Sequence, residues 1–500
     1  MLDKIKQLGS DTAVYGVSTI LGRFLTFILT PIYTHILAPN DLGIVATVFA
    51  YIAVLNVVYG YGMESAYMKY ASTMELGTRK QVFSVPFFSV GVTSFLFSLT
   101  ILVGSAPITD LINLSPSRVN LVVYSAAILF LDALVLVPFA SLRMAGKAKR
   151  FAAIKIAGIT LNVVCNLLFL FVAKMGVEGI FVSNIISSAA TLLMMLPTIL
   201  SQMSGGWHRE LYRALLKFGI PYVPAGLASM MIQVINRPMM EALQGAAAVG
   251  IFQANYRLGI FMMLIVSMYD FAWRPFFLSH AADPDAKKLF ARILTYFVLL
   301  TTGIFLLLSF YLADLVRLPI FWGHPLVARP YWDGLAIVPI ILLAYVFLGI
   351  YNNLVAGIYI EKKTQYLPVI TIAGALVNVV TNYLWIPAYG LQGAAYATLA
   401  SYVVMAGLLY VIVQRFYPVS YEWARIAKIA VSAGCVFGVF VFLPTGPWEP
   451  LWKFLLLALF VVLMYALKFF VPAERSALLA VFRRRGAPSS PADTPSDELS

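Results

Sequence analysis

The sequence predicts an all-α polytopic membrane protein with about fourteen transmembrane helices. These form two six-helix lobes, related by a pseudo-two-fold axis along the membrane normal, and two additional C-terminal helices. Three observations lead to this prediction: the composition, a long internal repeat, and the alternation of basic connecting segments. The 500 residues are 61% hydrophobic and 11% charged, with a mean hydropathy of +0.87. A soluble globular chain averages about 25% charged residues. This chain has too few charged residues to cover a surface that is exposed to water on all sides.

Fourteen apolar stretches are long enough to cross a bilayer, which takes about 20 residues per helix. They are expected at 11–36, 41–67, 80–105, 118–142, 151–173, 178–201, 216–240, 246–273, 289–312, 334–360, 366–387, 392–414, 424–443 and 451–471. The longest outer connection, from about Ala313 to Asp333, has roughly 20 residues and is too short for a domain. Any function therefore lies within the membrane or at its faces.

The motif Ile-Ala-Gly-x-x-x-Asn-Val-Val-x-Asn occurs twice, beginning at Ile156 and again at Ile372, a register of 216 residues. A Gly-x-x-Gly pair follows each copy, at Gly176 and at Gly390. Each copy begins after an even number of spans, so the two copies share one orientation in the membrane. The motif places a glycine and two asparagines on one helix face, which favours close helix packing over ligand binding. The repeat predicts a duplicated helix bundle.

The duplication divides the chain into four predicted parts. Residues 1–205 form the first six-helix lobe and 206–415 the second. Residues 416–485 hold the two additional transmembrane helices. Residues 486–500 are rich in Pro, Ser and Asp, a composition typical of a disordered tail.

Basic residues give the expected orientation, because cytoplasmic loops of membrane proteins are enriched in Lys and Arg. With both termini in the cytoplasm, 27 of the 35 Lys and Arg residues fall on the cytoplasmic side, Lys155 among them, and six fall outside. Arg23 and Arg257 remain within helices. This bias accounts for the net charge of +13, and no basic-aromatic groove indicates nucleic acid as a partner.

Signals of catalysis and of cofactor binding are missing from the sequence. The two cysteines, Cys165 and Cys435, lie inside apolar segments and cannot form a disulfide framework or a metal site. The four histidines are scattered without ligand spacing, and no phosphate-binding glycine loop or zinc motif is present. We therefore expect a protein that is not an enzyme and that needs no cofactor.

Two arginines near the middle of predicted spans are the leading candidates for a binding site. A mid-membrane Arg costs at least ~2.5 kcal/mol and persists beside water or a counter-charge. Further polar residues fall on the two helices that carry these arginines, 11–36 and 246–273, and on helices two and seven, at 41–67 and 216–240. Polar side chains on four helices indicate a hydrated cavity between the lobes. The alternative is that a structural partner such as Asp132 or Glu64 neutralises each arginine. The candidate substrate-binding residues are Arg23, Arg257, Gln253, Asn56, Gln233, Asn236, Arg237 and Glu64.

Two further acidic residues within spans have other expected roles. Asp132 lies mid-span in helix four and either binds a coupling proton or sodium ion or pairs with a basic residue. Asp270 and Arg274 lie one turn apart, which favours a local ion pair.

Three segments carry a resemblance to a known family. They are Gly-Ile-Tyr-Ile-Glu-Lys-Lys-Thr at 357–364, Leu-Ala-Pro-Asn-Asp-Leu-Gly-Ile at 37–44 and Gly-Tyr-Gly-Met-Glu-Ser-Ala at 60–66. Together with the duplicated bundle, they make 1–415 resemble the polysaccharide-biosynthesis (oligosaccharide flippase) family of the multidrug/oligosaccharidyl-lipid/polysaccharide exporter superfamily. The last two helices resemble an extension of some members, including lipid II flippases.

The resemblance implies alternating access by two lobes, with helices one, two, seven and eight lining the cavity. It implies transport of undecaprenyl-diphosphate-linked sugars from the inner to the outer leaflet of the bacterial plasma (inner) membrane. Lipid-linked oligosaccharide and membrane lipid are then the expected partners, with polysaccharide polymerase and export proteins as further candidates.

Three alternatives to an oligosaccharide flippase remain at this point. A cation-coupled drug or metabolite exporter would need carboxylates in the cavity, where this sequence offers mainly arginines. A lipid II flippase would share the diphosphate chemistry. A membrane glycosyltransferase, polymerase or ligase would need a catalytic carboxylate or a sizeable outer loop, and the sequence shows neither.

Overall fold

The protein is described here by a computed structural model that covers residue 16 and residues 20–25, 27–203, 206–321, 323–443 and 446–470. The predicted tail at 486–500 lies outside these ranges. Within them the regular structure is helical apart from one isolated bridge between Phe321 and His324. The predicted all-α fold class is confirmed.

The N-terminal half begins with an apolar helix at Ile20–Ile36. The helices that follow are α2 (Pro39–Gly60), α3 (Met63–Thr73), α4 (Arg79–Val103), α5 (Ser105–Leu111), η1 (Pro116–Arg118), α6 (Val119–Met144), α7 (Ala148–Leu167), the π-helical turn η2 (Leu168–Val172) and α8 (Val177–Gln202).

The C-terminal half is again helical throughout its described part. Its helices are α9 (Arg209–Gly219), α10 (Tyr222–Val234), α11 (Asn236–Gln244), α12 (Ala246–Tyr256), η3 (Arg257–Gly259), α13 (Ile260–Ser279), α14 (Ala286–Arg317), η4 (Arg329–Ile337), α15 (Val338–Ile360), α16 (Tyr366–Tyr389), α17 (Leu391–Val413), α18 (Trp423–Phe442) and α19 (Glu449–Ala466).

Within the described ranges, twelve helices are long and apolar enough to cross a membrane, or 13 if α9 and α10, which meet at an angle of 42°, form one span. These spans and the helix at Ile20–Ile36 coincide with the fourteen predicted ones, so the chain is a multi-pass membrane protein. The bend between α9 and α10 falls at Pro221, where a proline removes a backbone donor and opens the helix.

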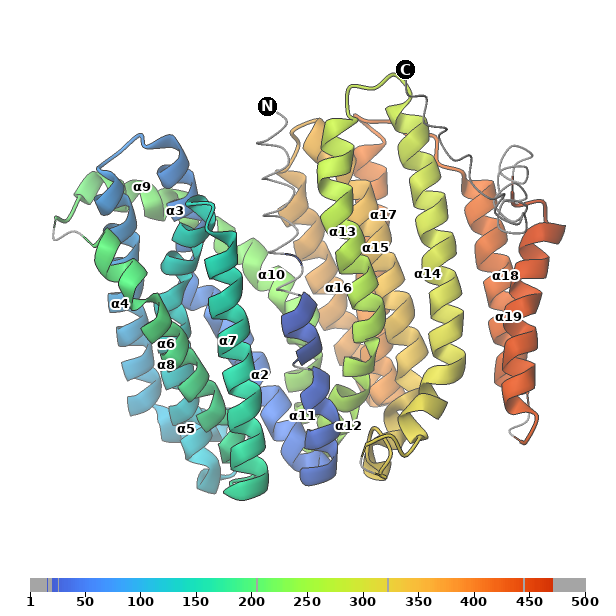
Figure 1. Ribbon diagram of the computed structural model, residues 1–500, viewed down its shortest axis with the longest axis horizontal. Coiled ribbons are helices and arrows are strands. Elements are labelled where there is room, and N and C mark those ends of the chain that lie inside the picture. Colours follow the sequence, from blue (N-terminus) through green and yellow to red (C-terminus); the bar gives the residue numbers. More distant parts are fainter. Residues whose placement is uncertain are drawn as a thin grey trace, which may run out of the picture. The chain divides into compact units, whose positions relative to one another are not determined.

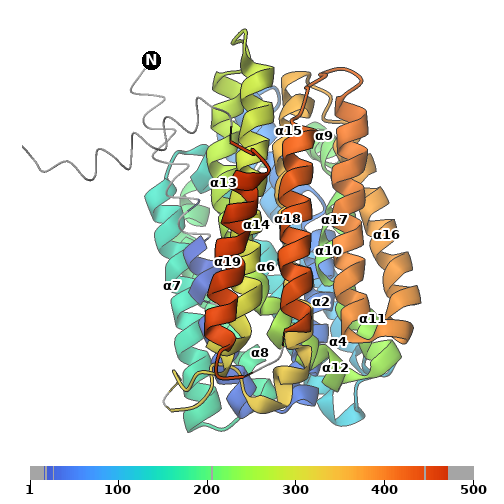
Figure 2. The same ribbon diagram turned by 90° about the vertical axis from the view of Figure 1, so that its right-hand side faces the viewer.

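The described chain separates into two compact units, one of 1–290 with 311–420 and one of 291–310 with 421–500. In the second unit α18 and α19 pack against each other and run side by side in Figure 2. Arg425 of α18 is paired with Glu422 at 2.9 Å and lies over the rings of Tyr296 and Phe469. Residues 291–310, predicted within the second lobe, thus group here with the two C-terminal helices.

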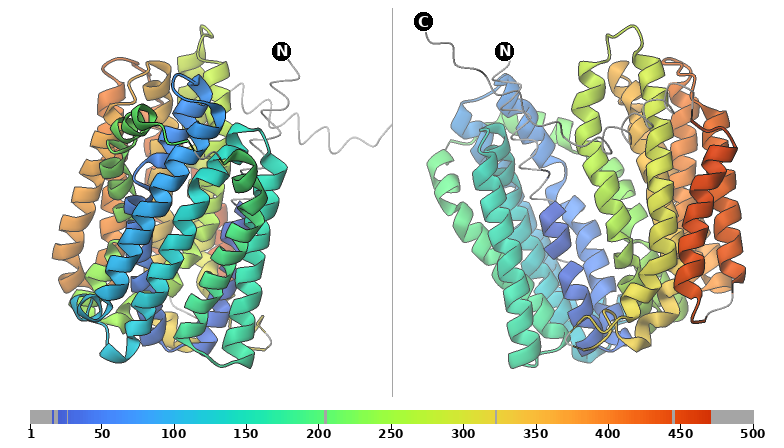
Figure 3. Two further views of the ribbon diagram at one scale, coloured as in Figure 1. Left: turned by 90° about the vertical axis from the view of Figure 1, so that its left-hand side faces the viewer. Right: turned by 45° about the vertical axis from the view of Figure 1, so that its right-hand side comes forward.

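The larger unit contains two bundles. In the first, α4 packs on α6 and α6 on α8, with α7 against α8, as the blue-to-green helices of Figure 3 show. In the second, α15 and α16 pack on α17, and α13 packs on α15 (Figure 1). Contact between the bundles comes from α2, which packs along α12, α10 and α11. This arrangement brings the helix pairs predicted to line a cavity next to one another.

The two motif copies have nearly the same structure. Asn166 donates to the Asn162 carbonyl oxygen at 2.8 Å, and Asn382 donates to that of Asn378 at 2.8 Å. The carbonyl oxygens of the two motif glycines each accept a serine hydroxyl from the next helix of the hairpin, at 2.8 Å in the first copy and 2.7 Å in the second. Asn378 also donates to the Ala397 carbonyl oxygen on the partner helix at 3.3 Å. The predicted packing role of the motif is confirmed.

Candidate functional site

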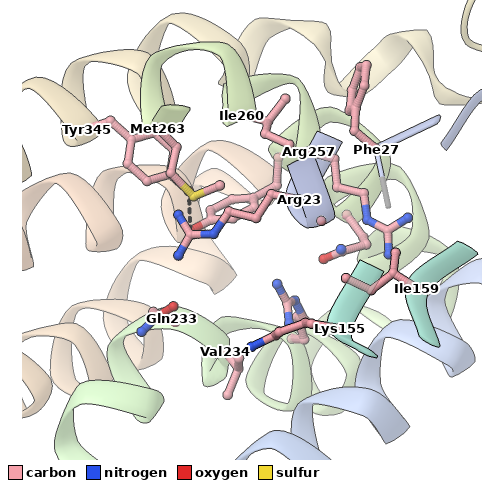
Figure 4. Close-up of a pocket in the computed structure, with 14 residues that line it drawn as sticks. Arg23, Phe27, Lys155, Ile159, Gln233, Val234, Arg257, Ile260, Met263 and Tyr345 are labelled. Atoms are coloured by element: carbon pink, nitrogen blue, oxygen red, sulfur yellow. Dashed lines mark hydrogen bonds between the residues drawn. The ribbon is translucent and has the colours of Figure 1, made fainter. Parts of the chain in front are cut away.

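A cavity of 480 Å³ lies between the two bundles of the larger unit (Figure 4). We call it the cationic cavity. It is lined by Gly22, Arg23, Phe27, Lys155, Ile159, Gln233, Val234, Arg237, Gln253, Tyr256, Arg257, Ile260, Met263 and Tyr345. Five of the predicted substrate-binding residues, from five different helical segments, therefore share one cavity.

Four basic side chains line the cavity, and none of the described residues that line it is acidic. Arg23 comes from the first helix, Lys155 from α7, Arg237 from α11 and Arg257 from η3. Among the described residues, none of these four side chains forms an ion pair with a carboxylate. The opposing charge is thus left to whatever occupies the cavity.

Neutral groups hold the arginines in place. Arg23 donates to the Ser267 hydroxyl at 3.1 Å. Arg257 donates to the Thr30 hydroxyl at 3.4 Å, and its guanidinium lies 5.8 Å from the centre of the Tyr33 ring. These contacts orient each guanidinium without neutralising it. In Figure 4, Arg23, Arg257 and Lys155 surround the same open space.

The local backbone explains how Arg257 reaches the cavity. The α-helix ends at Tyr256, and Arg257–Gly259 form one turn of 3-10 helix before α13 begins. Gly259 lets α15 pack closely against this turn, because a Cβ there would lie 2.7 Å from Ile341. Such breaks in a membrane helix are tolerated where they line a cavity rather than lipid.

Two amides add neutral hydrogen-bonding capacity. Gln253 is only 6% exposed, and its Oε1 atom has no hydrogen-bond partner in the described part of the chain. The Gln233 amide nitrogen donates to the Ser229 carbonyl oxygen at 3.3 Å, which leaves its side-chain oxygen at the cavity wall. A buried group without a partner is costly, and a polar ligand would relieve that cost.

Other predicted residues lie outside the cationic cavity. Glu64 forms a close ion pair with Arg143 of α6. Asn236 is 1% exposed, and Asn56 is half-buried on α2; neither belongs to the cavity lining. Asp132 accepts a hydrogen bond from the Ser188 hydroxyl at 2.6 Å. The structure therefore provides neither Glu64 nor Asp132 as the counter-charge considered for Arg23 and Arg257.

Sequence reasoning missed Lys155, Tyr256 and Tyr345 at this site. Lys155 was assigned to the cytoplasmic basic residues, whereas the structure places it two turns inside α7, at the cavity wall. The available signal was its position three residues before Gly158 on the helix that carries the motif. This spacing puts Lys155 and the packing glycine on one helix face, which turns Lys155 towards the protein interior. The Tyr345 hydroxyl donates to that of Tyr256 at 3.3 Å, joining α15 to α12. The two tyrosines had no signal of their own in so aromatic a chain.

Solved structures with a similar fold are transporters and flippases. The lipid II flippase MurJ in an inward closed conformation aligns with a TM-score of 0.69 and 16% identity, covering 91% of this chain and 99% of that one. An inward-facing multidrug resistance MATE family transporter of the MOP superfamily gives 0.62 and 16%, covering 79% and 94%. The outward-facing form gives 0.57 and 16%, covering 81% and 95%.

Comparison with curated proteins finds no significant match. At these identities the structural likeness shows the fold, which this chain shares with MATE transporters and MurJ. The family follows from the sequence itself: the family model described as polysaccharide biosynthesis protein matches residues 32–320, more than half of the chain. On that match, the chain belongs to the polysaccharide biosynthesis protein family.

Proposed function

We propose that the protein is a flippase, not an enzyme, and that it moves isoprenoid (undecaprenyl) diphosphate-linked oligosaccharide from the inner to the outer leaflet of a bacterial plasma membrane. The observation that carries this proposal is the convergence of four basic side chains, without a lining carboxylate, in the cationic cavity. A diphosphate cannot cross hydrocarbon unaided, because removing its charge from water is costly. Guanidinium groups offset that cost through charge-assisted hydrogen bonds.

The mechanism follows from this electrostatic match. Arg23 and Arg257 bind the diphosphate, and Gln253 and Gln233 add neutral hydrogen bonds. The lipid tail stays in the bilayer while the two bundles expose the cavity to one leaflet and then to the other. Both termini lie in the cytoplasm, and partners that polymerise or export the glycan receive it on the outer side.

The likeness to MurJ favours a second candidate, a lipid II flippase, which would use the same cavity chemistry. The likeness to multidrug transporters is a weaker guide, because a cavity with four cations repels cationic drugs. The two flippase candidates separate by phenotype: loss of surface polysaccharide supports the first, and loss of cell-wall synthesis with polysaccharide intact supports the second.

The direct test uses Arg23→Ala and Arg257→Ala, expressed at the native level in a strain that lacks the gene. Each arginine contributes about 1.5–3 kcal/mol through charge-assisted hydrogen bonds, so each variant should lower export roughly tenfold or more. Lipid-linked sugar should then accumulate on the inner leaflet. Arg415→Ala, which removes an exposed cation outside the cavity, is the matched control. Normal export by both cavity variants would refute the proposal.

A further inference from the structure

A second cavity, of 420 Å³, adjoins the cationic cavity. We call it the C-terminal chamber, because α10, α13, α15, α16 and α17 supply most of its wall. The two cavities share Arg23, Gln233, Tyr256, Met263 and Tyr345. In the view of Figure 4, Arg23 lies between Tyr345 and Arg257. A ligand held by Arg23 can therefore extend from one cavity into the other.

The chemistry of the C-terminal chamber differs from that of the cationic cavity. Its other polar lining residues are Ser229, Ser267, Asp270, Tyr351, Asn352, Thr371 and Tyr402. Hydroxyl, amide and aromatic groups thus replace the basic side chains. Two opposite charges, Arg23 and Asp270, belong to the lining, and Asp270 is paired with Arg274 at 3.1 Å. Such a wall suits an uncharged ligand that is rich in hydroxyl groups.

The internal repeat relates one residue of each cavity. The register of 216 residues that aligns Gly158 with Gly374 also aligns Lys155 with Thr371. Lys155 lines the cationic cavity, and Thr371 lines the C-terminal chamber. Equivalent positions of the two halves thus present a cation in one cavity and a hydroxyl in the other. The duplicated helices have diverged at a position that faces the cavities, while the packing motif beside it is retained.

The chamber wall is held rigidly from behind. The Asn353 amide donates a short hydrogen bond to the Tyr269 hydroxyl, and Trp273 Nε1 donates to the Asn353 carbonyl oxygen at 3.2 Å. These contacts fix α15 against α13. The adjacent Asn352 lines the chamber, and its side chain makes no hydrogen bond within the described residues. A positioned amide with free capacity can bind a ligand without first breaking an internal bond.

We infer that the C-terminal chamber binds the sugar that is attached directly to the diphosphate, and that this sugar is uncharged. The inference rests on the proposed function, since it assigns the diphosphate to the cationic cavity. Asn352, Thr371 and the Asp270 carboxylate hydrogen-bond the sugar hydroxyls. The faces of Tyr351 and Tyr402 pack on its C–H groups, which are attracted to the electron-rich ring faces. The chamber volume falls within the range of about 300–1,000 Å³ found for small-molecule sites.

The test measures binding of two probes to the purified full-length protein by titration calorimetry. The probes are farnesyl diphosphate and the same molecule with one glucose on its terminal phosphate. The wild type should bind the glucosylated probe about tenfold tighter. Loss of one hydrogen bond should weaken binding of this probe roughly threefold to tenfold in Asn352→Ala. Binding of farnesyl diphosphate should stay unchanged in that variant, and Arg257→Ala should weaken both probes.

Gln392→Ala, which deletes an exposed amide outside both cavities, is the matched control and should leave both affinities unchanged. If Asn352→Ala also loses farnesyl diphosphate binding, Thr371→Val is the second test, because Val keeps the shape of Thr and removes its hydroxyl. This variant should weaken binding of the glucosylated probe alone, and unchanged binding of that probe would contradict the chamber assignment. Equal wild-type affinity for the two probes would overturn the chamber assignment and leave the proposed function standing. Failure of the wild type to bind either probe would overturn both.

Discussion

Gly43 of α2 and Gly250 of α12 bring these two helices into direct backbone contact. A Cβ on Gly43 would lie 1.7 Å from the Ala246 carbonyl oxygen, and one on Gly250 would lie 1.9 Å from the Pro39 carbonyl oxygen. Because α2 belongs to the first bundle and α12 to the second, this contact joins the bundles at the end where both helices begin. The Tyr331 hydroxyl, which donates to the Leu37 carbonyl oxygen at 2.8 Å, reinforces the same end.

The first prediction concerns this glycine contact. Gly43→Ala and Gly250→Ala should each force α2 and α12 apart and lower the free energy of unfolding by about 1–3 kcal/mol, the usual cost of overpacking. Transport should fall as well, because the bundles can no longer meet. Thermal unfolding and export report the two effects. Gly407→Ala is the control, since its Cβ would have no neighbour within 4 Å, and it should be neutral or stabilising.

The second prediction concerns the ion pair of Glu64 and Arg143. The two side chains are 37% and 34% exposed, so the pair should contribute only about 0–1 kcal/mol. Glu64→Gln should lower the unfolding temperature slightly and leave transport per inserted molecule unchanged. The exchange Glu64→Arg with Arg143→Glu should recover the loss. Abolished transport at normal stability in Glu64→Gln would instead assign this carboxylate to the transport path.

The third prediction tests the cation that sequence reasoning missed. Lys155→Ala should weaken binding of farnesyl diphosphate about tenfold and reduce the sensitivity of binding to salt, since one fewer charge attracts the anion. Lys155→Arg should retain most of the affinity. Lys149→Ala removes an exposed lysine of the same helix outside the cavity and should have no effect. Wild-type affinity in Lys155→Ala would exclude the residue from the binding site.

The fourth prediction concerns the driving ion. Asp132 accepts a hydrogen bond from the Ser188 hydroxyl, and among the described residues it has no ion pair. Binding of a coupling proton or sodium ion stays a prediction for this carboxylate. In reconstituted vesicles, Asp132→Asn should therefore abolish the dependence of transport on an imposed proton or sodium gradient. The substitution preserves shape, so insertion should be normal. An unchanged response to both gradients would remove Asp132 from the coupling mechanism.

The cavity arginines could be predicted from the sequence because a charged group at mid-span cannot face lipid. Arg23 and Arg257 had to point towards a polar interior, and Gln253, one turn before Arg257, followed it. The span positions were equally accessible, since length and apolarity alone determine them. In these cases a single constraint, the cost of a charge in lipid or the thickness of the bilayer, is enough to place the residue or the span.

Asn56 and Glu64 show where this reasoning ends. A helix turns by about 100° per residue, so a small error in the assumed face moves a side chain out of a cavity. The partner of Glu64 is 79 residues away in the chain, on α6, and spacing alone could not identify it. The break at Arg257–Gly259 was also invisible, because no proline marks it. Such features depend on tertiary contacts that no local pattern encodes.

The two duplicated hairpins also bear on biosynthesis. Both reverse direction at a glycine in the same left-handed conformation, Gly176 and Gly390, each with φ of 57°. The side-chain amide N–H groups of Asn166, Asn378 and Asn382 all donate within their own hairpin. The Asn166 side-chain oxygen also accepts a hydrogen bond from the Tyr33 hydroxyl of the first helix at 2.8 Å. Each nascent pair of helices can thus associate as it leaves the insertion machinery. The N–H groups of its motif amides are then already hydrogen-bonded before later segments are synthesised.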